Sequence, residues 1–209
     1  MCGRITLTMP DVQAVAALVE ANLAPADAAL YRPRYNAAPS DRHWIVRPAA
    51  QGRVLIPAFW GLSGAINARA ESWAQRFPGT RPAIVPADGF YEWTGPKGGR
   101  RPLWFRPRAG GLLYLAALSQ ELPGGRMAFV VLTTDASGAV ARIHDRMPVL
   151  LRRDDVSGWI ERGDSGLLVP APPDFLTATD ASPRVNDVRN DDASLLDAPA
   201  PAGQLTLFG

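Results

Sequence analysis

The sequence predicts an α+β protein, built on a curved and mostly antiparallel β-sheet that closes into a barrel or half-barrel with a few short flanking helices. The first supporting observation is a series of short apolar runs, bounded by turn residues and spaced at short, regular intervals. The second is the scarcity of helical periodicity. The third is a hydrophobic content of 47%, which is ordinary for a 209-residue chain that buries one core.

The first predicted element is a helix near the N-terminus. Thr8 is expected to be its N-cap, with Asp11 three residues later, a spacing that is typical of helix starts. Apolar residues then recur at helical spacing as far as Asn22: Val12, Val15, Leu18 and Val19. The stretch R-P-R-Y-N-A-A-P-S follows, and its prolines predict an extended loop.

Strands are predicted beyond this loop wherever a stretch is short, apolar and bounded by turn residues. They cover residues 44–46, 54–60, 82–87, 89–93, 102–106, 112–118, 127–134 and 148–151. The sequence G-P-K-G-G-R, residues 95–100, predicts a hairpin turn between the fourth and fifth of them. Two short helices are expected around residues 137–143 and 154–162, the second because paired aspartates favour a helix N-terminus.

The chain is predicted to form one domain, residues 1–196, followed by a flexible tail, residues 197–209, that begins as an Ala/Pro linker. No apolar run approaches the ~20 residues of a membrane span, and no secretory signal is recognisable, so a cytoplasmic protein is expected. One cysteine cannot form an internal disulfide, which agrees with a reducing compartment. His43 and His144 lie far apart without ligand-spaced companions, so we expect no metal.

The formal net charge of +2 conceals two regions of opposite sign. Residues 1–153 contain 19 Lys and Arg against 10 Asp and Glu, whereas residues 154–209 contain 3 against 10. A basic body is typical of a protein that binds a polyanion. Lys97 is the only lysine among the 22 basic residues, and arginine both forks phosphate oxygens and stacks on bases. The pattern therefore indicates a nucleic-acid partner, with GC-rich coding bias as the alternative explanation of the arginine excess.

Cys2 is the only cysteine, and it directly follows the initiator methionine. Removal of Met1 would leave an α-amine and a thiol on one residue, a 1,2-aminothiol. The amine has a pKa near ~8 and is partly neutral at pH 7, and the thiolate is expected to be reachable with help from cationic neighbours. The pair could attack an acyl carbon, with the amine as base, or condense with an aldehyde to a thiazolidine. The alternative is a small buried hydrophobe.

Polar residues interrupt four segments where strands or tight turns are expected. The segments are M-C-G-R (1–4), I-N-A-R-A-E (66–71), A-D-G-F-Y-E-W (87–93) and I-H-D-R-M-P (143–148). Each has a structural explanation when taken alone. Asn67 could hold a turn, Glu92 could face solvent by strand alternation, and His144 could be a satisfied structural residue.

Taken together and in this order, the motifs M-C-G-R, R-Y-N-A-A-P, W-G-L, I-N-A-R-A-E-S, A-D-G-F-Y-E-W, T-T-D-A-S and I-H-D-R-M-P-V-L-L give a specific resemblance. From Met1 to about Leu196 the chain resembles the SOS-response-associated peptidase (SRAP) family, whose members crosslink to abasic sites in single-stranded DNA. The resemblance implies a compact domain around a curved antiparallel sheet. It also implies that Cys2 lies at the floor of a basic groove.

The resemblance implies four catalytic residues and no cofactor. Cys2, freed from Met1, would be the nucleophile that forms a thiazolidine with the aldehyde of an opened abasic sugar. Glu92 would be the general acid–base, His144 would assist ring opening, and Asn67 would orient the Cys2 amine or the opened sugar. Release of Met1 by the domain itself and reversal of the crosslink are further implications.

The same motifs supply candidate DNA contacts. Arg4, Arg69 and Arg146 are expected to bind phosphates, which fixes register without reading sequence. Candidates for packing against a base or sugar beside the lesion are Trp93, Pro39 and Asn36. Trp93 could instead belong to the core.

Two further stretches carry expectations of their own. The link Trp60–Ala65 is shorter than in family members, which puts in doubt any preference for single-strand/double-strand junctions. In the tail, the peptide Gln204, Leu205, Thr206, Leu207 and Phe208 resembles the motif by which bacterial proteins dock on the DNA sliding clamp. The alternative is a tail that folds back on its own domain.

Two rival functions stay open at this point. N-terminal-nucleophile amidohydrolases of the glutaminase type also begin Met-Cys-Gly, but their substrate-clamping motifs are not recognisable here. A noncovalent reader of single-stranded DNA, with Cys2 merely structural, is the second.

Overall fold

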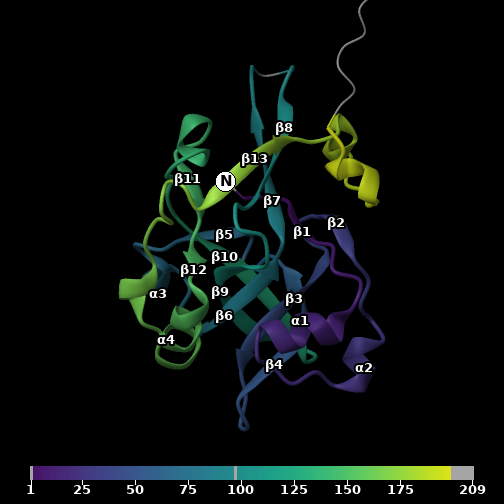
Figure 1. The fold of residues 1–209 in the computed structure, drawn as a ribbon. Coiled ribbons are helices and arrows are strands. Elements are labelled where there is room, and N and C mark those ends of the chain that lie inside the picture. Colours follow the sequence, from purple (N-terminus) through teal and green to yellow (C-terminus); the bar gives the residue numbers. More distant parts are fainter. Residues whose placement is uncertain (1, 97, 199–209) are drawn as a thin grey trace, which may run out of the picture.

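A computed structural model describes residues 2–96 and 98–198 of the chain (Figure 1). Five strands close a mixed barrel in the order β10-β4-β3-β6-β9 and back to β10. Their bounds are Arg42–Pro48 for β3, Arg53–Trp60 for β4, Arg81–Ala87 for β6, Leu113–Leu122 for β9 and Arg126–Asp135 for β10. All neighbours are antiparallel except β10 and β4, which run parallel. The predicted mostly antiparallel barrel is therefore confirmed.

Three short strands extend the barrel around β10 and β9. They are β5 (Asn67–Arg69), β11 (Arg146–Pro148) and β12 (Leu150–Leu151). β5 pairs with β10 in parallel, while β11 pairs with β10 and β12 with β9, both antiparallel.

A second sheet is antiparallel throughout, in the order β13-β8-β7-β1-β2. Its strands are β1 (Ile5–Leu7), β2 (Arg34–Ala37), β7 (Gly89–Thr94), β8 (Arg101–Pro107) and β13 (Leu176–Asp180). In Figure 1 the β7–β8 hairpin projects from the barrel.

Helices are few and short, as predicted. The α-helices are α1 (Val12–Leu18), α2 (Pro25–Ala28), α3 (Trp73–Arg76) and α4 (Val156–Arg162). The 3-10 turns are η1 (Val140–Arg142), η2 (Arg153–Asp155), η3 (Ser165–Leu167), η4 (Pro183–Asn186) and η5 (Ala193–Leu196). None of the helices in the described part of the chain is long and apolar enough to cross a membrane.

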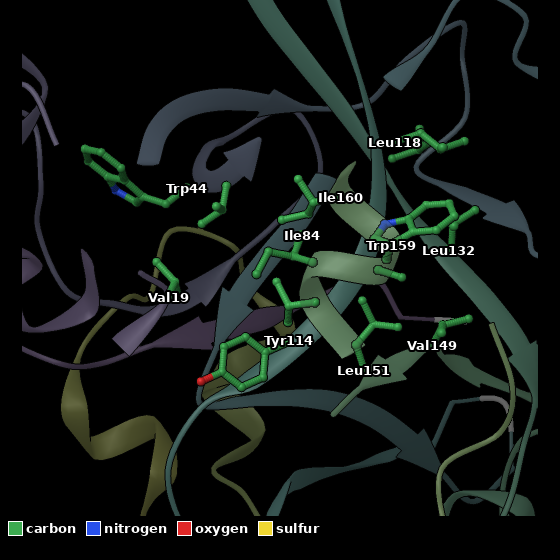
Figure 2. Close-up of a cluster of buried hydrophobic side chains, with 14 of the residues drawn as sticks. Val19, Trp44, Ile84, Tyr114, Leu118, Leu132, Val149, Leu151, Trp159 and Ile160 are labelled. Atoms are coloured by element: carbon green, nitrogen blue, oxygen red, sulfur yellow. The ribbon is translucent and has the colours of Figure 1, made fainter. Parts of the chain in front are cut away.

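Strand alternation divides the core between two clusters. One face of the barrel strands packs against α1 and α4, and Figure 2 shows Trp159 and Ile160 of α4 beside Ile84 and Leu132 of the strands. The Trp159 Nε1 also donates to the carbonyl of Ala83 at 2.8 Å, so the helix is fixed by a polar contact as well. The other face packs against the second sheet and includes Cys2.

The eight predicted strands are all present, with residues 148–151 divided between β11 and β12, and the hairpin turn lies where expected. Lys97 of that turn is outside the described residues. The predicted helix at 154–162 is η2 followed by α4, whereas the one at 137–143 is only the 3-10 turn η1. The proline-rich loop contains β2, because tertiary pairing with β1 overrides the local signal.

The N-terminal helix was predicted to begin too early and to end too late. α1 is capped by Asp11, whose Oδ1 accepts from the Gln13 amide at 2.8 Å, and it ends at Leu18. Thr8 is not the cap because its amide and its Oγ1 both donate to Asp88, 80 residues away. A local pattern could not reveal this distant partner.

Candidate functional site

Cys2 lies fully buried at the foot of β1, and Asp88 is what holds that strand in place. The Asp88 carboxylate accepts hydrogen bonds from the Thr6 Oγ1, from the Thr8 amide and from the Thr8 Oγ1, the last at 2.6 Å. The Asp88 amide donates to the carbonyl of Thr6 at 2.9 Å. One carboxylate at the start of β7 thus fixes the short N-terminal strand, which has only three residues of its own to pair.

Gly89 allows the second sheet to close around β1. A Cβ built at Gly89 would lie 2.1 Å from the Trp104 Nε1, so no other residue fits without displacing that ring. The Trp104 Nε1 in turn donates to the Thr6 Oγ1 at 3.2 Å. The A-D-G motif is therefore a positioning device for the N-terminus.

The register between β1 and β7 brings Glu92 to the N-terminal end of the chain. Ile5 pairs with Phe90, and the Tyr91 amide donates to the carbonyl of Arg4 at 3.0 Å. Because the strands are antiparallel, the next residues along β7 approach the residues before Arg4. Glu92 is buried, with 5% of its surface exposed, and not on a solvent face.

Burial raises the pKa of the Cys2 thiol, and the nearby negative charge of Glu92 raises it further. The surroundings as a whole therefore favour the neutral thiol in this state of the protein, while the positive charge of the N-terminus acts in the opposite direction. If the Cys2 thiol is to lose its proton here, a nearby base must accept it. The carboxylate of Glu92, whose charge raises the pKa of the thiol, is the candidate for that base.

Asn67 contacts the backbone of Cys2. Its Nδ2 donates to the Cys2 carbonyl at 2.8 Å, so it holds the residue through the carbonyl group. Its Oδ1 is buried and has no hydrogen-bond partner among the described residues. The parallel pairing of Asn67 with Val131 of β10 fixes the position of this amide.

The I-N-A-R and H-D-R-M-P motifs flank β10 on opposite sides. Thr133 of β10 pairs with Arg69 on one side and with Pro148 on the other. His144 precedes β11, and its side chain is 29% exposed. The His144 Nδ1 lies 3.0 Å from the Arg146 amide and 2.8 Å from the Asp145 Oδ1. The tautomer of the neutral His144 ring determines which contact is a hydrogen bond. An Nδ1 without a proton accepts from the Arg146 amide, whereas an Nδ1 that carries the proton donates to the Asp145 carboxylate.

Arg146 does not point into a groove. Its guanidinium is buried and pairs with both oxygens of Glu71 at 2.8 and 2.9 Å, with Asp135 at 2.7 Å and with the Thr133 carbonyl at 2.6 Å. The predicted phosphate contact of Arg146 is thus not supported by this geometry, because protein partners already bind both terminal nitrogens of its guanidinium. Arg146 instead ties the two motifs together across β10. Arg69, by contrast, is exposed.

Asn36 is also engaged inside the protein. It is fully buried, its Nδ2 lies within 3.2 Å of the carbonyls of Val185, Asp187 and Asn190, and its Oδ1 accepts from the Arg4 Nη1 at 2.9 Å. Its predicted packing against DNA is therefore wrong, because no part of the side chain reaches the surface.

The remaining candidates lie near the surface. Pro39 is half-buried in the turn after β2. Trp93 is half-buried as well; its Nε1 donates to the Asn186 Oδ1 at 2.6 Å, and the Arg4 guanidinium lies 5.7 Å from its ring centre. Trp93 packs at the edge of a small cluster and does not lie in either main core.

Sequence reasoning missed the C-terminal segment 183–191, which reaches back to Arg4, Asn36 and Trp93. The available signal was the stretch R-V-N-D-V-R-N-D, polar residues in a proline-flanked region. Asp88 and Glu71 lay inside the quoted motifs but received no role. Both act on residues far away in the sequence.

The shortened link after β4 is a tight turn. Ser63 and Gly64 both have positive φ, of 51° and 76°, and Leu62 and Ala65 exchange two backbone hydrogen bonds. The Trp60 side chain is buried in the core, where its ring stacks on that of Phe129. The tail residues Gln204, Leu205, Leu207 and Phe208 lie outside the described residues. In the described part of the chain, no group of three or more His, Cys, Asp or Glu side chains could hold a metal ion.

Comparison with known proteins gives consistent matches. Residues 1–188 match the family described as SOS response associated peptidase (SRAP). In Bacillus subtilis (strain 168), the abasic site processing protein YoaM is 29% identical over 195 residues, covering 80% of this chain and 86% of that protein. The abasic site processing protein YoqW from the same organism is 27% identical over 226 residues, covering 95% and 100%.

A crystal structure of a protein from Bacteroides thetaiotaomicron has the same fold, with a TM-score of 0.80 at 16% identity, covering 95% of this chain and 100% of that one. The family match extends from the N-terminal Cys2 segment through the β7 motif and into the C-terminal segment, as far as residue 188. The chain belongs to the SRAP family.

Proposed function

We propose that this protein captures abasic sites in single-stranded DNA, forming a covalent thiazolidine through Cys2 after loss of Met1, and so shields the lesion. The observation that carries the proposal is the arrangement around Cys2: a buried thiol at the second position of the chain, next to a buried carboxylate and held through its carbonyl by Asn67. The names of the relatives as abasic site processing proteins support it.

The chemistry balances without a cofactor. The neutral α-amine of Cys2 adds to the aldehyde carbon of the opened sugar, and loss of one water gives an imine. The sulfur then adds to the same carbon while the nitrogen takes up a proton, which closes a five-membered ring. One water leaves in total and nothing is oxidised or reduced. Reversal of these steps releases the DNA.

Glu92 is the proposed general acid–base. It carries a proton from the nitrogen to the departing hydroxyl as the carbinolamine loses water, and then carries the thiol proton, whose loss the surroundings otherwise disfavour, to the nitrogen as the ring closes. A positioned group of this kind contributes ~100- to 10,000-fold to a rate. The buried Asn67 Oδ1 would accept a hydrogen bond from the Cys2 nitrogen or from the opened sugar. His144 would hydrogen-bond the departing sugar oxygen.

Side chains near the surface are proposed to bind the DNA noncovalently. Arg4 and Arg69 are the proposed phosphate contacts, and Trp93 and Pro39 the proposed packing surfaces for a base or sugar. Stacking of this kind is worth roughly 1–3 kcal/mol per base and tolerates any sequence, which suits a protein that must act wherever a base is lost.

The test is a denaturing gel with single-stranded DNA that carries one abasic site. Wild-type protein should give a shifted band without reductant. Cys2→Ala should give none, yet should still be trapped when borohydride is added, because its amine still forms an imine. Equal bands from Cys2→Ala without reductant would rule out the thiazolidine, and an unshifted band with all proteins would leave a noncovalent reader.

Three finer proposals accompany this function. Met1 is released by the domain's own Cys2 site, which would make the protein a peptidase toward itself and a lyase-like protein toward its adduct. The protein acts as a monomer at the nucleoid. Residues 204–208 bind the bacterial sliding clamp, and a peptide of that sequence should bind purified clamp with an affinity that Phe208→Ala abolishes.

A further inference from the structure

The pocket beside Trp93 is walled by residues from three distant parts of the chain. It has a volume of about 530 Å³, and its lining is Arg4, Trp93, Gly98, Arg100 and Asn186. Arg4 is two residues from Cys2 and Trp93 follows Glu92 on β7, so two of the lining residues lie close along the chain to residues of the proposed reaction centre. Its volume falls within the range of about 300–1,000 Å³ that is typical of small-ligand sites.

The C-terminal wall of the pocket is rigidly attached. The Arg34 Nε donates to Asp191 at 2.5 Å, the Tyr35 and Asn36 amides donate to the same carboxylate at 2.6 and 2.9 Å, and the Arg4 Nη1 donates to the Val185 carbonyl at 2.6 Å. These contacts join residues more than 150 positions apart in the sequence. A buried asparagine and a half-buried arginine are thus used to fix one short segment against β1 and β2.

The lining has the chemistry of a nucleotide site. The guanidinium groups of Arg4 and Arg100 can both bind a phosphate, and the Trp93 ring offers a surface for a base. Among the described residues that line the pocket there is no carboxylate. The Asn186 Oδ1 accepts from the Trp93 Nε1, so the amide orients the indole, and its Nδ2 group carries two further donors. Gly98 has φ of 93° and adds no side chain to the entrance.

We propose that this pocket binds the nucleotide next to the abasic sugar, with Asn186 contacting its base or sugar and Arg100 its phosphate. The inference rests on the proposed function and deepens it: segment 183–191 becomes part of the DNA site. It also gives Asn36 a role, since Asn36 holds the wall of the pocket and does not touch DNA itself.

The test measures noncovalent binding of single-stranded DNA that carries a tetrahydrofuran abasic analogue, which has no aldehyde. Asn186→Asp keeps an acceptor for Trp93 but adds a negative charge, and Arg100→Ala removes one positive charge from an exposed position. Each should weaken binding about tenfold. For Arg100→Ala, the slope of log affinity against log salt should also fall by about 0.7, the value for one phosphate contact on a single strand. Gln75→Glu and Arg126→Ala make matched charge changes at exposed sites outside the pocket and should have little effect.

Substrate truncation identifies the contact. With oligonucleotides that end at the analogue on one side or the other, the effect of Asn186→Asp should vanish for the substrate that lacks the bound nucleotide. Undiminished effects on both truncated substrates, or unchanged affinity of both variants for the full substrate, would overturn the proposal. Crosslinking of wild-type protein to a true abasic site reports separately on the proposed function.

Discussion

His43 gives the protein a pH-dependent stability that can be worked out from its surroundings. The side chain lies on β3 with 1% of its surface exposed, and burial lowers its pKa from 6.5 to about 4. The Nε2 is 3.1 Å from the carbonyl of Pro86, while the Nδ1 is buried without a hydrogen-bond partner among the described residues. A proton added at Nδ1 would therefore create a buried, unpaired charge.

The sign of the effect follows from the depressed pKa. Above pH 6.5 both states of His43 are neutral, whereas between pH 6.5 and about 4 the unfolded state binds a proton and the folded state does not. The free energy of unfolding therefore falls as the pH is lowered through this window. At about 1.4 kcal/mol per pH unit, the loss is about 3 kcal/mol, a large part of the ~5–15 kcal/mol that stabilises a typical domain.

Urea denaturation at pH 7 and at pH 4 measures this loss. His43→Gln retains a donor for Pro86 but does not titrate, so its stability should fall by about 3 kcal/mol less than that of the wild type between the two pH values. Between pH 8 and pH 9, where His43 is neutral in both states, the two proteins should show the same change in stability. Identical pH dependence in wild type and His43→Gln would refute the argument.

Three further changes test the site. Glu92→Gln removes the negative charge beside Cys2, so the pH at which iodoacetamide alkylates the thiol should shift downward while crosslinking slows at least tenfold; an upward or absent shift would contradict the contact. Gly89→Ala should lower the free energy of unfolding in urea by about 1–3 kcal/mol, because its Cβ meets the Trp104 ring and the Phe105 carbonyl oxygen, and an unchanged midpoint would contradict this close packing. Arg146→Ala should cost about 1–3 kcal/mol in the same assay and also slow crosslinking at saturating DNA, since both motifs lose their tie; normal crosslinking would separate that tie from the chemistry.

The strands were predictable because each is a short apolar run bounded by turn residues. The first strand, β1, was not, since Ile5–Leu7 is too short to stand out as such a run and is held by Asp88 from far along the chain. The same distance explains the wrong helix cap at Thr8. Local pattern was sufficient where the partner is a neighbour and insufficient where it is not.

In the candidate site, too, the sequence revealed some features and missed those that depend on distant partners. The motifs brought attention to Cys2, Asn67 and Glu92, and in the structure Asn67 and Glu92 act directly on Cys2. Residue type suggested DNA contacts for Asn36 and Arg146, but type cannot reveal burial. Asn36 is occupied by carbonyls about 150 residues away and Arg146 by acidic partners across β10.

The most direct measurement is the intact mass of the adduct formed with an abasic-site oligonucleotide in the absence of reductant. The account predicts the mass of the protein without Met1 plus the DNA minus one water, with the DNA attached to Cys2 on peptide mapping. An adduct that retains Met1, or one attached to any other residue, would contradict it.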